Sequence, residues 1–161
     1  MSKKASMNSL RRILLVEDSP GDAELALYAL AKHKLTNEVL HLHDGAQALD
    51  YLFRRGEFSG RAEGNPAVVL LDLKMPKVDG LQVLRQIKGE PALSMIPVVV
   101  FTSSREKRDL EAAYRLGVNA YVVKPMNFND FTDAVKQVGA FWAILNEPTP
   151  ASTSVADEHN R

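Results

Sequence analysis

Five polar side chains have the types and spacing of a phosphoryl-transfer site. Each closely follows or ends a short apolar run, and together they are Glu17, Asp18, Asp72, Thr102 and Lys124. An aspartate carboxylate can act as a nucleophile and form an aspartyl phosphate. A lysine ammonium can pair with one phosphoryl oxygen, and a threonine hydroxyl can donate a hydrogen bond to another. Catalysis of such a transfer depends mostly on positioning and charge neutralisation.

The three acidic residues also predict a metal site. Two like unit charges about 4 Å apart repel by about 4 kcal/mol at an effective dielectric constant near 20. Carboxylates gathered in one place therefore need a cation, although any one of them alone is equally well explained as an exposed polar strand end. Oxygen ligands that leave coordination positions to water suit Mg²⁺. The set of Glu17, Asp18 and Asp72 thus favours a bound Mg²⁺ over a plain polar surface.

Five apolar runs, most of them rich in Val and Ile, predict the strands that must bring these residues together. They span residues 13–16, 39–42, 68–71, 98–101 and 121–123. Helices are predicted to alternate with them, one opening at Ser19-Pro20 and the others spanning 45–53, 80–87, 106–116 and 128–145. Strands that alternate with helices predict an α/β fold, with a parallel sheet covered on both faces.

The order of the predicted strands decides whether the polar residues meet. Five strand–helix units suit a doubly wound, flavodoxin-like sheet of order 2-1-3-4-5, which is taken from known sheets of this kind and not from the residues. In that order the first, third, fourth and fifth strands are neighbours. Ligands bind beyond the carboxyl ends of the strands in such sheets. We therefore expect the five polar residues at one rim.

Composition limits the other classes of function. The 161 residues include 20 basic and 20 acidic side chains, without the basic excess of a nucleic-acid-binding protein. The charged run 105–111 indicates a solvated helix face. The absence of cysteine excludes disulfides and thiol chemistry, and no apolar run approaches the roughly 18 residues of a membrane span. We expect a cytoplasmic protein that binds neither nucleic acid nor membrane.

A single domain is predicted to occupy most of the chain. Residues 11–146 hold all the predicted strands and helices, and residues 54–66 are polar and Gly-rich, which predicts a long surface loop. Residues 1–10 are expected to form a flexible N-terminus, and residues 147–161, rich in Pro, Thr and Ser, a disordered tail.

Four segments of the chain resemble the receiver domains of bacterial two-component response regulators, which have a CheY-like fold. They are Leu-Val-Glu-Asp-Ser at 15–19, Leu-Leu-Asp-Leu-Lys-Met-Pro-Lys-Val-Asp-Gly at 70–80, Phe-Thr-Ser-Ser at 101–104 and Tyr-Val-Val-Lys-Pro at 121–125. The similarity extends from about residue 11 to residue 145. It implies a protein that accepts a phosphoryl group from a sensor histidine kinase. It also implies self-catalysed acceptance and slow self-dephosphorylation, and no other enzymatic activity.

The resemblance further implies roles for the residues that match the family pattern. Asp72 is the expected phosphoacceptor and Lys124 the group that holds the phosphoryl oxygens. Asp18, Asp72 and the main-chain carbonyl of Lys74 are the expected Mg²⁺ ligands, and Glu17 binds the ion directly or through water.

The resemblance also implies a switch and an unusual turn. Thr102 is expected to move toward the phosphate, and Tyr121 to follow it inward. Pro125, directly after Lys124, is expected to follow a cis peptide bond.

Lys74 departs from the commonest receiver pattern. It places a cation two residues after the acceptor, where many receivers have a neutral side chain. We hypothesise that this ammonium shields the acyl phosphate from water. The lifetime of the phospho-aspartate in a Lys74→Ala variant would test this.

Several segments are similar to the single-domain response regulators of bacterial and cyanobacterial phytochromes. They are residues 54–66, 72–76, 102–104 and 141–148. This similarity implies a phytochrome histidine kinase as the phosphodonor. The output would be partner binding or, alternatively, relay of the phosphoryl group to a histidine phosphotransfer protein, and the sequence does not choose between them.

Three rival functions fit the sequence less well. Phosphatases that form an aspartyl phosphate carry Asp-x-Asp after the first strand, whereas the candidate nucleophile here follows the third. Nucleotide and flavin binding would require a glycine-rich phosphate loop, and none follows the first strand. A degenerate receiver that only docks partners would not need the complete set of acceptor, acid pair, Thr and Lys.

The end of the last predicted helix suggests a homodimer. Residues 138–145 are apolar except for Gly139, so Phe141 or Trp142 is expected to face outward. With Tyr114 and Tyr121 nearby, the fourth helix, fifth strand and fifth helix would form a symmetric interface, as in many receivers. The alternative is that the disordered tail folds back over this patch.

Overall fold

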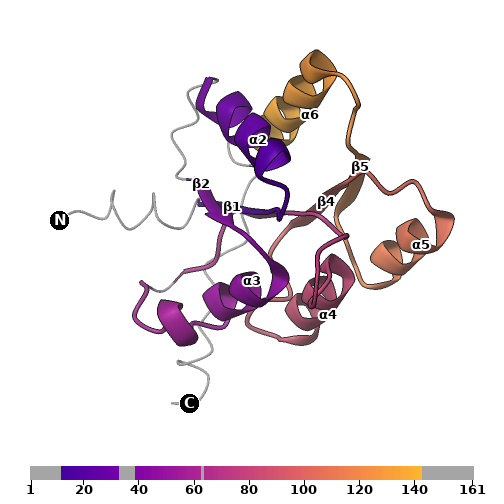
Figure 1. The fold of residues 1–161 in the computed structure, drawn as a ribbon. Coiled ribbons are helices and arrows are strands. Elements are labelled where there is room, and N and C mark those ends of the chain that lie inside the picture. The colour runs from indigo at the N-terminus through magenta and orange to yellow at the C-terminus, as the bar shows by residue number, and fades with distance from the viewer. Residues whose placement is uncertain (1–11, 33–38, 63, 143–161) are drawn as a thin grey trace.

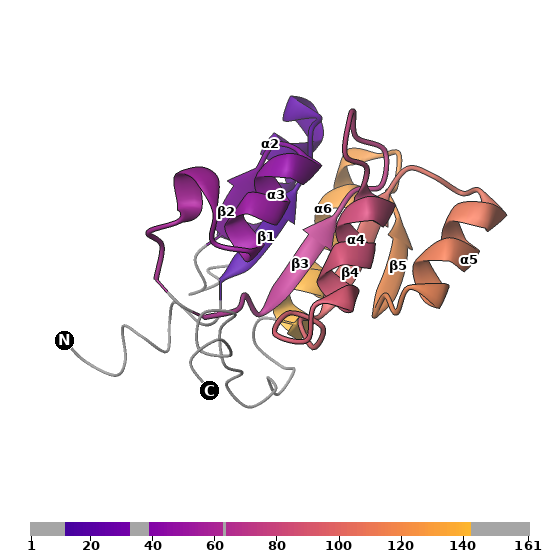
Figure 2. The same cartoon turned by 90° about the horizontal axis from the view of Figure 1, so that it is seen from below.

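The sheet has the strand order expected from the sequence. The computed structural model describes residues 12–32, 39–62 and 64–142. Its parallel sheet has the order β2-β1-β3-β4-β5, which confirms the predicted topology. The strands are β1 (Ile13–Val16), β2 (Val39–Leu42), β3 (Val68–Leu71), β4 (Val98–Thr102) and β5 (Ala120–Val123). They run in one direction (Figure 2), so their carboxyl ends form a single rim.

Within the described residues, α-helices cover both faces of this sheet. They are α2 (Pro20–Lys32), α3 (Gly45–Leu52), α4 (Gly80–Gly89), α5 (Lys107–Arg115) and α6 (Phe128–Ala140). Figure 1 shows α2 and α6 side by side on one face and α3, α4 and α5 on the other. The end of the predicted last helix, 143–145, and both predicted tails lie outside the described residues. In the part of the chain that is described, no helix has the length and apolarity to cross a membrane.

Local side-chain caps fix where the helices begin at the rim. The Ser19 hydroxyl accepts a hydrogen bond from the Asp22 amide at 3.4 Å, and Pro20 occupies the first helical position of α2, as predicted. Asp79 and Gln82 form a reciprocal capping box at the start of α4. These caps satisfy amide groups that would otherwise lack partners, and they hold both helix N-termini beside the carboxyl ends of β1 and β3.

Gly80 allows α4 to approach the end of β3 closely. A β-carbon at this position would overlap the carbonyl oxygen of Asp72 and lie 2.7 Å from the Cα atom of Leu73. A larger residue would therefore push the helix away from the main chain of Asp72. The glycine has a packing role that places α4 directly against the candidate acceptor.

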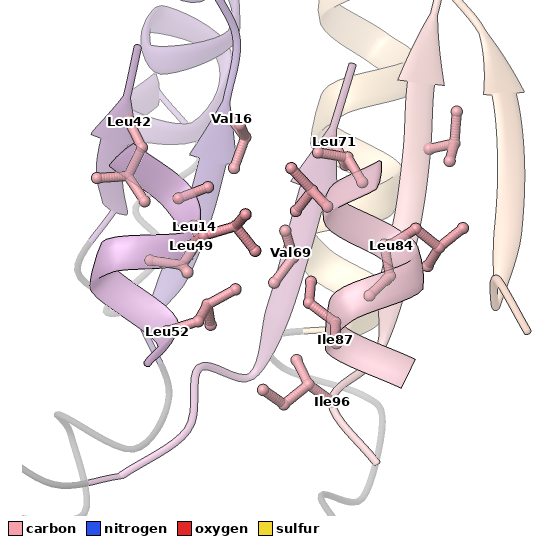
Figure 3. Close-up of a cluster of buried hydrophobic side chains, with 14 of the residues drawn as sticks. Leu14, Val16, Leu42, Leu49, Leu52, Val69, Leu71, Leu84, Ile87 and Ile96 are labelled. Atoms are coloured by element: carbon pink, nitrogen blue, oxygen red, sulfur yellow. The ribbon is translucent and has the colours of Figure 1, made fainter. Parts of the chain in front are cut away.

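The strand side chains alternate between two buried layers, as expected for a sheet covered on both faces. Leu14, Val16, Val69 and Leu71 pack against α3 and α4, as Figure 3 shows. On the other face the strands pack against α2 and α6, where the rings of Phe101 and Phe131 meet edge to face with centroids 5.1 Å apart. The two layers fix the sheet and therefore the rim.

The loop predicted at 54–66 contains a short 3-10 turn, Gly56–Phe58, and is anchored to the domain. The Arg61 guanidinium lies 4.2 Å from the centroid of the Tyr51 ring. Its Nε donates to the Tyr51 carbonyl oxygen at 2.7 Å, and its Nη1 donates to the carbonyl oxygens of Ala62 and Gly64. These contacts, together with the Phe58 ring that packs edge to face on Tyr51, hold the loop against the end of α3.

Candidate functional site

Backbone hydrogen bonds place three of the predicted residues at one rim. The amides of Glu17, Asp72 and Lys124 donate to carbonyl oxygens at the ends of the neighbouring strands, at 3.1, 3.1 and 2.7 Å. The strand registers align Val16 with Leu71 and Thr102 with Val123, so the ends of neighbouring strands are level. The convergence that was predicted from the sheet order is therefore present.

The three acidic residues form a compact cluster. One carboxylate oxygen each from Glu17, Asp18 and Asp72 lies within 4.8 Å of the other two. Glu17 and Asp72 are buried, while Asp18 is exposed. A buried, all-oxygen cluster that opens to water on one side has the donor set that Mg²⁺ requires, and these residues fit that ion.

Lys124 is the buried cation of the site. Its Nζ donates to Glu17 Oε1 at 2.7 Å, to Asp22 Oδ2 at 2.8 Å and to Asp72 Oδ2 at 3.1 Å. An ammonium has three donors, and here all three are used on carboxylates. One ammonium therefore faces four carboxylates when Asp18 is included, so the cluster keeps an excess of negative charge.

Asp22 is a site residue that the sequence analysis missed. No role was predicted for it, yet its carboxylate reaches Lys124 from the first turn of α2. Its position four residues after Asp18 was the available signal, because a helix that begins at Pro20 directs its first turn toward the same rim.

The surroundings raise the pKa values of both Glu17 and Lys124. Burial raises the pKa of Glu17 to about 7, assisted by the charge of Asp72 and opposed by the hydrogen bond from Lys124. Burial alone would lower the pKa of Lys124, but hydrogen bonds to Asp22 and Glu17 outweigh it and the pKa is raised. The ammonium therefore stays charged, while burial opposes the ionisation of Glu17.

Ser104 connects the two residues of the predicted switch. Thr102 is fully buried, and its Oγ1 accepts a hydrogen bond from the Ser104 amide at 3.4 Å. The Tyr121 hydroxyl donates to the Ser104 carbonyl oxygen at 3.0 Å. Both side chains therefore contact the same residue of the loop between β4 and α5.

Lys74 directs its side chain to α5. Its Nζ lies 3.0 Å from Asp109 Oδ2, while its amide donates to Asp72 Oδ1 at 3.4 Å. The role of its main-chain carbonyl oxygen as a metal ligand stays a prediction.

The solvated helix face predicted for 105–111 is wrong at Asp109. Lys107 and Arg108 are exposed as expected, but Asp109 is buried and accepts a hydrogen bond from the Ser104 hydroxyl at 2.6 Å. Lys74 and Ser104 compensate the buried charge. The spacing of four residues to the buried Ala113 would have indicated that Asp109 lies on the inner stripe of α5.

The cis bond expected before Pro125 is also wrong. Among the described residues there is no cis peptide bond, so the Lys124–Pro125 bond is trans. For a bond to proline the trans form is favoured by only about 0.5–1 kcal/mol. The residue types therefore do not determine the isomer, and the surrounding turn does.

The predicted dimer surface is partly exposed. Tyr114 on α5 is 53% exposed and Phe141, after α6, is 49% exposed. Trp142 instead packs against the core layer beneath α2 and α6. Of the two aromatic residues expected at this place, Phe141 is the one that faces outward.

Comparison with known proteins gives consistent matches over most of the chain. A family model described as the response regulator receiver domain matches residues 13–136. The chain is 45% identical over 140 residues to the probable methanogenesis regulatory protein FilR2 of Methanothrix harundinacea, covering 86% of this chain and 88% of that protein.

Two solved structures are similar in fold and sequence. The phosphorylated cyanobacterial phytochrome response regulator RcpA has a TM-score of 0.82 and 37% identity, covering 87% of this chain and 99% of that one. The bacteriophytochrome response regulator RtBRR has 59% identity and a TM-score of 0.70, covering 89% of this chain and 86% of that one.

Proposed function

This chain belongs to the response regulator receiver family, and we propose that it accepts a phosphoryl group from a sensor histidine kinase on Asp72 in a Mg²⁺-dependent reaction. The observation that carries the proposal is the position of Lys124. Its buried ammonium lies 3.1 Å from Asp72 Oδ2 and is shared with two further carboxylates. An anionic ligand that arrives at Asp72 can therefore compete for a cation that is already in place.

In the proposed transfer, an oxygen of Asp72 forms a bond with phosphorus while the bond from phosphorus to the imidazole nitrogen of the donor breaks. Lys124 exchanges part of its contacts with Glu17 and Asp22 for a phosphoryl oxygen. These two carboxylates hold the ammonium at the acceptor before the donor arrives. The chain thus supplies the nucleophile and a preplaced positive charge.

The carboxylates of Asp18 and Asp72 would hold Mg²⁺ with the main-chain carbonyl of Lys74, and Glu17 would act directly or through water. The bound ion supplies positive charge that offsets the repulsion between the carboxylates and the phosphoryl oxygens. The cluster of Glu17, Asp18 and Asp72 supports this assignment.

The conformational response is proposed to run through Thr102 and Tyr121. The Thr102 hydroxyl can donate to a phosphoryl oxygen, which draws it away from the Ser104 amide. Because Tyr121 also bonds Ser104, movement of this residue would release the tyrosine. The new negative charge would thus change the surface formed by α5, β5 and the loop between β4 and α5.

The names of two similar proteins guide the choice of donor. RcpA and RtBRR are phytochrome response regulators by name, and the 59% identity to RtBRR favours a phytochrome histidine kinase as the donor. We propose a cytoplasmic single-domain regulator, residues 11–146, that acts by binding partners. Relay to a histidine phosphotransfer protein gains no support from these similarities.

A homodimer through α5, β5 and α6 is also proposed, on the exposure of Tyr114 and Phe141. A Phe141→Glu variant should then be monomeric in light scattering at concentrations where the wild type is dimeric. A monomeric wild type would end this part of the proposal.

Phosphorylation by acetyl phosphate with Mg²⁺ tests the proposed function. Peptide mapping by mass spectrometry should locate a single phosphoryl group on Asp72, and chelation of the metal should prevent the reaction. The Asp72→Asn variant is the control. Equal phosphorylation of this variant would contradict the proposal.

A further inference from the structure

Asp109 has no part in the acceptor cluster, yet it is buried and charged. Its side chain is 8% exposed and contacts Lys74 and the hydroxyl of Ser104. Asp109 is therefore a fixed anion on α5, joined to the loop that follows Asp72.

The partner of this anion lies next to the acceptor in the chain. The Lys74 amide donates to Asp72 Oδ1, so its main chain borders the acceptor carboxylate, while its ammonium is directed to α5. A lysine has a flexible four-carbon stem and a compact charge. The same main-chain position would let the ammonium approach a phosphoryl group on Asp72 if Asp109 did not bind it.

The Lys74 side chain lies beside open space. A cavity of about 330 Å³ lies beside the ion pair, and Lys74, Asp109 and Leu81 are among its lining residues. The Lys74 side chain is also 56% exposed, and its ion pair with Asp109 sets the direction of the ammonium.

We propose, on the basis of the proposed acceptor function, that Asp109 is a positioning residue that shortens the lifetime of phospho-Asp72 by holding the Lys74 ammonium away from it. In dephosphorylation a water oxygen bonds to phosphorus and the bond between phosphorus and the Asp72 oxygen breaks. The products are the free carboxylate and inorganic phosphate, and the proton of the water passes to phosphate or solvent. An ammonium against the phosphoryl group would obstruct this attack, and Asp109 prevents it from lying there.

Asp109→Asn is the variant that isolates the charge, because the amide oxygen can still accept the hydrogen bond from Ser104. The protein is phosphorylated with acetyl phosphate and Mg²⁺, the donor is removed, and loss of phosphate is followed by intact mass. The lifetime should increase roughly three- to fivefold, the scale of one partly exposed ion pair. Asp109→Glu keeps the carboxylate and should restore the wild-type lifetime.

Lys74→Ala decides whether the effect passes through the lysine. Alone it should change the lifetime little, because Asp109 already holds the ammonium away from the phosphoryl group. The shielding by Lys74 that the sequence predicts is therefore expected only in the variant that lacks the Asp109 carboxylate. In the double variant with Asp109→Asn, it should return the lifetime to the wild-type value. A long lifetime in the double variant would overturn the proposal, since the effect would then be structural.

Glu111→Gln is the matched control, because it removes one carboxylate from the exposed side of the same helix. Its lifetime should equal that of the wild type. Equal lifetimes for the wild type and Asp109→Asn would refute the positioning role while leaving Asp72 as the acceptor. Absence of phosphorylation in the wild type would instead refute the acceptor function itself.

Discussion

Two cations at opposite ends of the sheet are held in different ways. Lys124, at the carboxyl ends of the strands, donates only to carboxylates. Arg61 packs on Tyr51, which in turn contacts Arg12 just before β1, and it donates to neutral carbonyl oxygens. Burial lowers the pKa of Arg61, whereas the surrounding acids raise the pKa of Lys124 despite its burial.

The difference separates a structural contact from a reactive site. Carbonyl oxygens do not repel one another strongly, so the contacts of Arg61 are complete and gain nothing from a further ligand. The carboxylates around Lys124 repel one another and exceed the cation in charge. Such a cluster is stabilised by an added divalent cation. Its ammonium can also exchange a carboxylate contact for a contact with an incoming anion.

The largest expected effect comes from removing the reactive cation. Lys124→Met should slow phosphorylation by acetyl phosphate by about 100-fold or more, the scale of losing one preplaced charge at a transition state. Arg61→Met should leave the rate within about twofold, because its contacts lie at the other end of the sheet. Initial rates from intact mass measure both. Similar losses in the two variants would remove the distinction between the two cations.

The next effect is a dependence of metal affinity on pH. The pKa of Glu17 is raised to about 7, so below this pH the side chain holds a proton that the metal must displace. Affinity should therefore decrease as pH falls, by on the order of tenfold between pH 7.5 and 5.5. Calorimetric titration with Mg²⁺ measures this. Glu17→Gln should lose most of the dependence, and the same slope in both proteins would show that another group titrates.

A smaller effect, on the stability of the domain, is expected from removing Arg61. Arg61→Ala removes hydrogen bonds to carbonyl oxygens and the contact with Tyr51, and should lower the free energy of unfolding by about 1 kcal/mol. Urea denaturation measures it. An unchanged midpoint would show that the anchored loop contributes nothing to the stability of the domain.

The sequence predicted the sheet order through a known topology and the start of α2 through its cap at Ser19 and Pro20. Glu17, Asp18, Asp72 and Lys124 could be found because their place after buried strands is independent of the rest of the packing. Asp22 and Asp109 could not be assigned in the same way. Both lie on helices, where the direction of a side chain depends on how the helix is rotated against its neighbours.

The turn after Lys124 illustrates a second limit. Its Pro125 was expected to follow a cis bond from the family pattern, but the two isomers differ too little in energy for residue type to decide. The loop at 54–66 is a third case. Its composition predicted exposure correctly in part, while the anchoring of Arg61 on Tyr51 joins residues ten apart and has no periodic signal.

Amide NMR spectra with beryllofluoride and Mg²⁺, which together mimic a phosphorylated aspartate, test the central claim most directly. Large shifts should appear at Asp72, Thr102 and Lys124, with almost none around Arg61, and they should vanish in Asp72→Ala. Shifts centred on Arg61, or shifts that persist in Asp72→Ala, would contradict the assignment of the carboxyl-end rim as the acceptor site.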